Sequence, residues 1–132
     1  MNPRSPAIAE RAAHRCEYCR APEAGFNLRF EVEHIVPRCC GGGEDNLNLA
    51  LSCRACNLHK SVHTHLDANE EKPIPLFHPR DQSWEEHFTV STASGEIEGV
   101  TEIGRATVLQ LQMNTPLQLK ARKVWMKLGL YP

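Results

Sequence analysis

A histidine directly after a glutamate is the first group in this sequence that could do acid–base chemistry. His34 follows Glu33, and two asparagines come later at Asn48 and Asn57. An imidazole with a near-neutral pKa can take a proton from water. Carboxylate and amide oxygens are ligands of hard divalent cations. These residue types could therefore support metal-assisted hydrolysis, although a lone Glu-His pair is more often a solvated pair and Asn57 could simply cap a helix.

Two cysteine hooks enclose this region of the chain. Each hook has the spacing C-x-x-C, and the four cysteines are Cys16, Cys19, Cys53 and Cys56. Paired hooks of this kind can surround one zinc ion tetrahedrally, whereas a single hook could be a redox pair and a secreted chain could form disulfides. The first six residues lack the apolar run of a signal peptide. The spacing therefore predicts a structural zinc site.

Two further cysteines, Cys39 and Cys40, have no partner in this scheme. We expect two free thiols on a loop, because adjacent cysteines form a strained ring when they bond to each other. A disulfide or redox role is the alternative.

The elements between the hooks must position the candidate residues. Alternation of apolar and polar residues predicts one strand near residues 30–35 and another near 47–51, with a glycine-rich loop between them. Residues 57–66 contain no Gly or Pro and predict a helix. The predicted class is α+β, a ββα unit pinned by zinc. Adjacent side chains on a strand point to opposite faces, so a bend at residues 35–37 must bring Glu33 and His34 to one site.

This segment resembles the HNH endonuclease family, whose ββα-metal fold cuts nucleic-acid phosphodiesters. The resemblance spans about residues 16–60 and rests on VEHIVPR at 32–38, GG at 42–43, NLALSC at 48–53 and CNLHK at 56–60. Shorter similarities to compact bacterial HNH proteins follow at 75–80, 84–88 and 104–108.

The resemblance implies a role for each candidate residue. His34 would be the general base, Glu33 and Asn57 would bind the catalytic cation, and Asn48 would hydrogen-bond the backbone near His34. The position of Asn57 is often a histidine in this family. Two oxygen ligands favour Mg²⁺ or Mn²⁺ over Zn²⁺ or Ni²⁺ at the catalytic position.

Charge is unevenly distributed along the 132 residues, although the net charge is only −1. Residues 67–104 are acidic, whereas residues 105–132 carry five Lys and Arg and no Asp or Glu. Near the candidate site we predict phosphate contacts by three basic residues, which could equally be solvated surface charges: Arg38, Arg54 and Lys60.

The length is that of one domain with a small core, which we divide into two parts. Residues 1–66 are predicted to form the zinc-clamped core, and residues 67–132 an extension that packs on it. The extension would begin with a linker up to residue 75 and contain a core anchor at Trp84. A β-hairpin at 87–90 and 97–100 and two helices at 104–113 and 115–128 would follow.

The last predicted helix carries an apolar stripe that we expect to pack against the protein, composed of Leu117, Ala121, Val124, Trp125 and Leu128. The basic residues off the stripe are either a solvated face or a face toward DNA.

Together these features predict a cytoplasmic, metal-dependent HNH endonuclease that hydrolyses DNA, with RNA as the alternative substrate. We expect structural zinc, catalytic Mg²⁺ or Mn²⁺, a monomer or homodimer, and no membrane contact, since no apolar run is long enough to span one. The alternative function is a zinc-stabilised nucleic-acid-binding module without catalysis. His78 and His87 match the family resemblance without a chemical role that we can assign.

Overall fold

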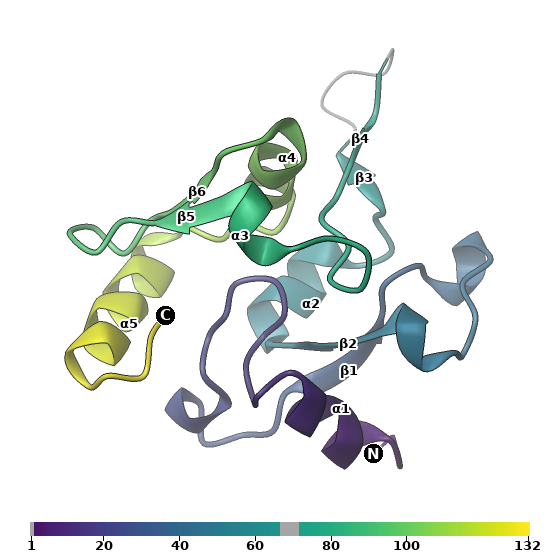
Figure 1. Ribbon diagram of the computed structural model, residues 1–132, viewed down its shortest axis with the longest axis horizontal. Coiled ribbons are helices and arrows are strands. Elements are labelled where there is room, and N and C mark those ends of the chain that lie inside the picture. Colours follow the sequence, from purple (N-terminus) through teal and green to yellow (C-terminus); the bar gives the residue numbers. More distant parts are fainter. Residues whose placement is uncertain (1, 67–71) are drawn as a thin grey trace.

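The computed structural model describes residues 2–66 and 72–132. Its first half is built on an antiparallel hairpin in which β1 (Glu31–His34) pairs with β2 (Leu49–Ser52). Helix α1 (Ser5–Arg11) contacts both strands, and α2 (Arg54–Lys60) packs on β1 (Figure 1). All four residues of β2 are buried in this arrangement. The strand, loop, strand and helix predicted from the sequence are present, and the α+β class is confirmed.

Helix α2 has other bounds than those predicted. It begins at Arg54, because the Cys53 side chain accepts a hydrogen bond from the Cys56 amide and caps the helix. Asn57 is therefore not the cap; it lies inside the helix. The helix ends at Lys60, since Ser61 adopts a positive φ of 50°. The prediction of a helix through residue 66 was wrong.

The chain forms a small hairpin where the sequence suggested the end of a helix and a linker. Strand β3 (His65–Leu66) pairs with β4 (Ile74–Pro75). The β-branched and histidine-rich run at 61–65 is a poor helix former, and it extends instead. The middle of the predicted linker, residues 67–71, lies outside the described residues.

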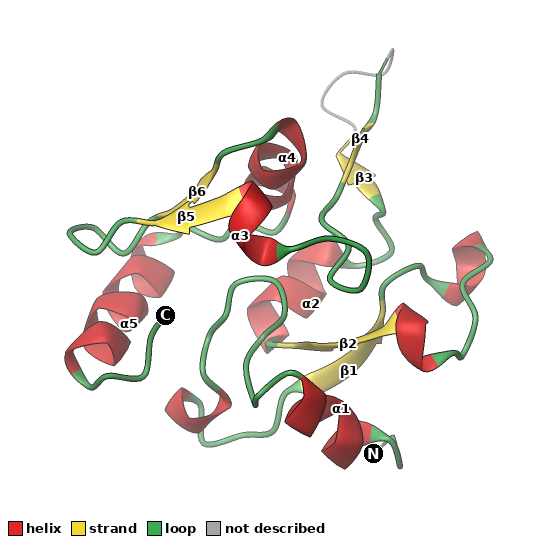
Figure 2. Cartoon of the chain, viewed as in Figure 1, coloured by secondary structure: helices red, strands yellow, loops and turns green. Residues whose placement is uncertain are grey.

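The second half contains a short hairpin that lies between helices along the chain (Figure 2), and each of its strands has three residues. Helix α3 (Trp84–His87) leads into β5 (Phe88–Val90), which pairs with β6 (Ile97–Gly99) as the sequence predicted. Helix α4 (Glu102–Gln110) starts two residues before its predicted beginning, because the Thr101 side chain caps it through the Gly104 amide. Helix α5 (Pro116–Lys127) begins one residue after its predicted start, because Thr115 caps it in a capping box with Gln118.

Three short 3₁₀ turns complete the elements: η1 (Glu23–Gly25), η2 (Arg38–Cys40) and η3 (Asn46–Asn48). The last two frame the loop between β1 and β2, which carries much of the candidate site.

Helix α5 packs through part of its predicted apolar stripe, because Trp125 packs against the core and the Phe26 ring, whereas other members of the stripe face solvent. Leu117 is 77% exposed, and Val124 and Leu128 are also exposed. The inner face instead carries Arg122, which is buried and donates hydrogen bonds to the Gly95 and Met113 carbonyls and to Asn114. Three acceptors satisfy the guanidinium, so a charged residue can be buried where the pattern favoured leucines.

The extension packs directly on the first cysteine hook. Trp84, the predicted anchor, is buried, and its indole donates a 2.7 Å hydrogen bond to the Tyr18 carbonyl. The Tyr131 hydroxyl donates a 2.8 Å bond to the Cys19 carbonyl. Both acceptors lie in the turn of the hook, so the second half holds the cysteines of the first in place. Within residues 2–66 and 72–132, no helix combines the length and apolar character needed to cross a membrane.

Candidate catalytic cleft and metal centre

The four hook cysteines converge on one point. Their sulfur atoms all lie within 4.8 Å of one another, and all four residues are buried. The Sγ atoms of Cys19 and Cys53 are 3.7 Å apart. Two thiolates at about 2.3 Å from a tetrahedral zinc ion are separated by about 3.8 Å. The cluster therefore has the composition, burial and spacing of a closed structural zinc site.

A cleft of about 400 Å³ opens between β1, the η2 turn and α2. Glu33, His34 and Asn57 all line it, and Arg38 and Cys39 lie on its rim from the η2 side. The fold therefore places residues of β1 and α2 around one cavity, although the Glu33 carboxylate itself is buried and bonded to Tyr18 and Lys60.

His34 lies at the end of β1, with its side chain 21% exposed. Its Nε2 is 3.0 Å from a carboxylate oxygen of Glu44. A proton on Nε2 that is donated to this carboxylate leaves Nδ1 as the proton acceptor of the neutral imidazole. This is the tautomer that a general base needs, if Nδ1 faces the water to be activated.

Glu44 is a member of the site that sequence reasoning missed. Hydrogen bonds from Arg38 and His34, with the charges of both, lower the pKa of the Glu44 carboxyl to about 2. Because this pKa lies below the ordinary value of 4.5, the contacts of Glu44 are fully present above about pH 4.5 and are lost as the pH falls toward 2. The carboxylate is therefore anionic at any pH at which His34 could be a neutral base.

Asn48 joins the two ends of the loop between β1 and β2. Its side-chain oxygen accepts from the Val36 amide, and its Nδ2 donates to the Val36 and Gly43 carbonyls, each at 2.9 Å. Val36 is two residues from His34, so these are the backbone contacts that the sequence led us to expect. A catalytic contribution of Asn48 remains a prediction.

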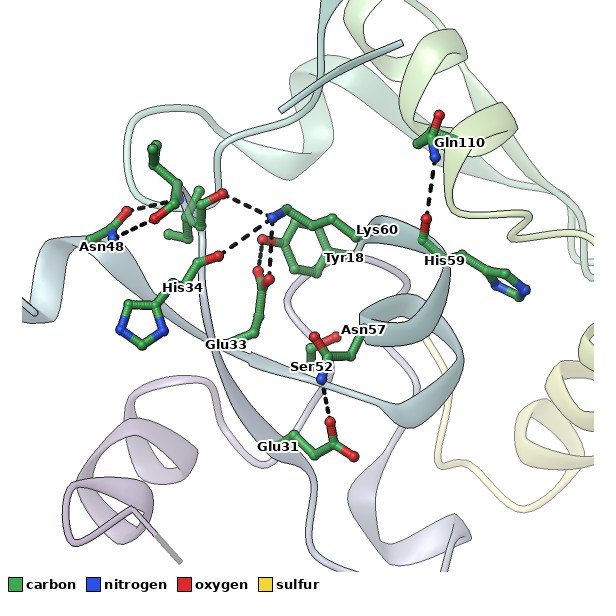
Figure 3. A network of polar contacts seen from close by, with 12 residues as sticks. Tyr18, Glu31, Glu33, His34, Asn48, Ser52, Asn57, His59, Lys60 and Gln110 are labelled. Carbon is green, nitrogen blue, oxygen red and sulfur yellow. Dashed lines mark hydrogen bonds and ion pairs between the residues drawn. The ribbon is translucent and has the colours of Figure 1, made fainter. Parts of the chain in front are cut away.

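Glu33 points away from His34 and into the protein (Figure 3). It accepts hydrogen bonds from the Tyr18 hydroxyl and from the Lys60 ammonium, the latter at 3.2 Å. Burial raises the pKa of Glu33, and the Lys60 charge acts in the opposite direction. Tyr18, which precedes the second cysteine of the first hook, could not be connected to the site from sequence spacing.

Lys60 has a different place from the one predicted. It is only 1% exposed, and besides Glu33 it donates to the Ile35 carbonyl at 2.8 Å. An ammonium held in the interior does not reach a phosphate on the surface. The predicted phosphate contact by Lys60 is therefore wrong, and Lys60 forms an internal ion pair with Glu33 instead. Its long side chain can reach Glu33 from the end of α2.

Asn57 is held by a carboxylate that the sequence analysis did not single out. Its Nδ2 donates to Glu31 (Figure 3), which also pairs with Arg54 at 3.0 Å. Glu31 and Glu33 are two residues apart on β1 and so face α2 together. That spacing was the available signal for Glu31. Arg54 and Arg38 both remain largely exposed, and Arg38 lines the cleft.

Comparison with known proteins adds to this geometry. Residues 16–63 match the model of the HNH endonuclease family. This stretch is an HNH endonuclease domain. No curated protein and no solved structure matches the chain. The matched residues of the HNH domain include both cysteine hooks, the β1–β2 hairpin, α2 and every residue of the cleft named above.

The Glu44–His34 pair leads to a first prediction. Replacing Glu44 by alanine frees the imidazole of the HNH domain to rotate and to change tautomer. We expect cleavage to slow by up to about 10²-fold, the effect of a misplaced catalytic group. The cleavage rate of Glu44→Gln should lie between those of the wild type and Glu44→Ala, because the glutamine amide oxygen can still accept a hydrogen bond from Nε2 of His34. Single-turnover cleavage rates at fixed cation concentration measure the effect.

Glu10→Ala is the matched control, since Glu10 is an exposed carboxylate on α1. Wild-type rates in both Glu44 variants would show that Glu44 does not position His34.

Proposed function

We propose that this protein is a metal-dependent endonuclease that hydrolyses DNA phosphodiester bonds, with His34 as the general base. The observation that carries the proposal is the cleft that His34, Glu33 and Asn57 share in an HNH domain. A pure binding module has no need for an imidazole that a carboxylate holds beside oxygen ligands.

Each residue of the cleft has a separate role in the proposed reaction. His34 takes the proton of the attacking water on Nδ1, while Glu44 holds Nε2. Arg38, which lines the cleft, and Arg54, which pairs with Glu31, are both largely exposed and are the proposed phosphate contacts. A divalent cation, when bound, supplies charge stabilisation for the phosphoryl group and the departing 3′-oxygen.

The donor set fits a hard cation. Asn57 uses its Nδ2 toward Glu31, which leaves its amide oxygen to serve as a ligand. Each carboxylate oxygen of Glu33 accepts one hydrogen bond and retains a second lone pair. Oxygen donors of this kind suit Mg²⁺ or Mn²⁺. We therefore keep Glu33 and Asn57 as the proposed ligands and the four buried cysteines as ligands of structural zinc.

The alternative function, a zinc-stabilised nucleic-acid-binding module without catalysis, is favoured by one contact. The Lys60 ammonium already neutralises Glu33, in the place where a cation would bind its carboxylate. Plasmid nicking with Mg²⁺ against EDTA separates the two functions. Cleavage that depends on the cation supports the nuclease, and DNA binding without cleavage under any divalent cation supports the module.

The remaining parts of the proposal concern the whole chain. We propose DNA as the substrate before RNA, a monomer or homodimer in the cytoplasm, and a division into a zinc-clamped core at 1–66 and an extension at 67–132.

The second prediction identifies the cation ligands. Glu33→Gln keeps the shape of the side chain but removes its charge, so activity should need more Mn²⁺ or disappear. Glu31→Gln is the matched variant, because Glu31 lies two residues away on the same face of β1. The cation concentration that it needs for nicking should be closer to that of the wild type. Asn57→His adds a nitrogen donor and should extend activity to Ni²⁺ or Zn²⁺. Cation titrations of plasmid nicking measure all three.

Glutamine is preferred to alanine at position 33, because its amide oxygen can still accept a hydrogen bond from the buried Lys60 ammonium. Both variants remove the charge that pairs with Lys60, and breaking a buried ion pair costs about 3–5 kcal/mol, so the folding of each variant is checked first by circular dichroism. If Glu31→Gln weakens cation binding and Glu33→Gln does not, Glu31 is the ligand and the proposed site geometry is wrong.

A further inference from the structure

Two exposed thiols lie in the η2 turn, beside the candidate cleft. Cys39 and Cys40 are both free and exposed in the η2 turn, and Cys39 lines the same cavity as His34 and Asn57. Their Sγ atoms are 3.7 Å apart. This is the separation between Cys19 and Cys53 in the buried cluster. The exposed pair therefore already has the spacing of two thiolates that share one ion.

The turn that carries the thiols is held firmly by its backbone. The Pro37 carbonyl accepts from the amides of Cys40 and Gly42, at 2.9 and 3.0 Å. Gly42 cannot be replaced without movement, since an added Cβ would lie 1.7 Å from the Val36 carbonyl oxygen. Asn48 fixes Val36 and Gly43 on either side. The thiols are thus presented in a defined geometry, which lowers the entropy lost when both bind one ion.

A shared ion suits this geometry better than a disulfide does. The Cα atoms of adjacent residues are about 3.8 Å apart across a trans peptide, whereas disulfides usually need about 4.4–6.8 Å. Two thiolates on one tetrahedral ion need a sulfur separation of about 3.8 Å and no sulfur–sulfur bond. Thiolates select soft, thiophilic ions.

We propose that Cys39 and Cys40 form a binding site for a thiophilic metal or metalloid ion, and that its occupation obstructs the cleft. Both thiols lose a proton and form one bond each to the ion. With a trivalent arsenic oxide, the arsenic–oxygen bond breaks and the oxygen leaves as water with those two protons, so no electrons are transferred. The obstruction of cleavage rests on the proposed nuclease function, whereas ion binding does not.

Phenylarsine oxide is the probe, because it bridges two neighbouring exposed thiols. The zinc-loaded, full-length protein is compared with Cys39→Ser, Cys40→Ser and the double variant. Intact mass spectrometry counts the bound arsenical and inductively coupled plasma measurement counts zinc. Plasmid nicking is then measured with and without the probe. The four cysteines of the cluster are buried and should stay loaded with zinc in every protein.

We expect one arsenical per wild-type molecule, removed by a competing dithiol, and at least tenfold weaker retention in each single variant. Nicking should be lost in the treated wild type and kept in the treated double variant. Equal binding in the double variant would overturn the site, because the buried cluster would then be the target. Binding with unchanged nicking would overturn the obstruction. An untreated wild type without nicking would contradict the nuclease function while the mass count still decides the ion site.

Discussion

Replacing His34 by alanine is expected to slow DNA cleavage by about 10²–10⁴-fold, the usual contribution of a general base. The imidazole is the group in the cleft whose second nitrogen can take a proton while Glu44 holds the first. Its side chain is partly exposed, so the variant should fold and bind DNA like the wild type. Single-turnover cleavage and a DNA-binding isotherm separate the chemical step from binding.

Two further measurements sharpen this test. His63→Ala removes an exposed histidine that follows α2 and should leave the rate unchanged. Added imidazole should partly restore cleavage in His34→Ala, because a small base can enter the cavity left by the side chain. A purified His34→Ala protein that cuts at the wild-type rate would remove His34 from the mechanism.

Replacing Cys16 by serine is expected to unfold the HNH domain. Binding of a structural zinc ion supplies about 10–16 kcal/mol in zinc-finger peptides, as much as the whole stability of a typical domain. Cys16 is fully buried in the cluster, and the turn after it receives hydrogen bonds from Trp84 and Tyr131. Loss of the ion should therefore loosen the extension as well. Circular dichroism measures the loss of folded structure, and elemental analysis measures the loss of zinc.

Cys39→Ser is the matched control for this experiment, because it also removes one thiol but lies outside the buried cluster. It should retain one tightly held zinc ion and the wild-type unfolding temperature. A wild-type protein that stays folded after complete removal of zinc would show that the hooks stabilise the domain in another way.

The fold could be predicted where local pattern controls it. Strands β1 and β2 follow from alternation, and the convergence of the two cysteine hooks follows from their paired spacing, which favours a shared centre. The limits of α2 could not be read in this way, because a cap by a cysteine side chain and a positive φ at Ser61 override the absence of Gly and Pro.

The sequence by itself determined which residue types the HNH domain offers for the proposed catalysis, since the spacing of His34, Asn48 and Asn57 along short elements limits where they can lie. Only the tertiary structure decided the partners of these residues. Glu44 reaches His34 because the loop folds back, and Lys60 reaches Glu33 because α2 packs on β1. Such contacts depend on the relative placement of separate elements, which long-range packing sets and local spacing does not encode.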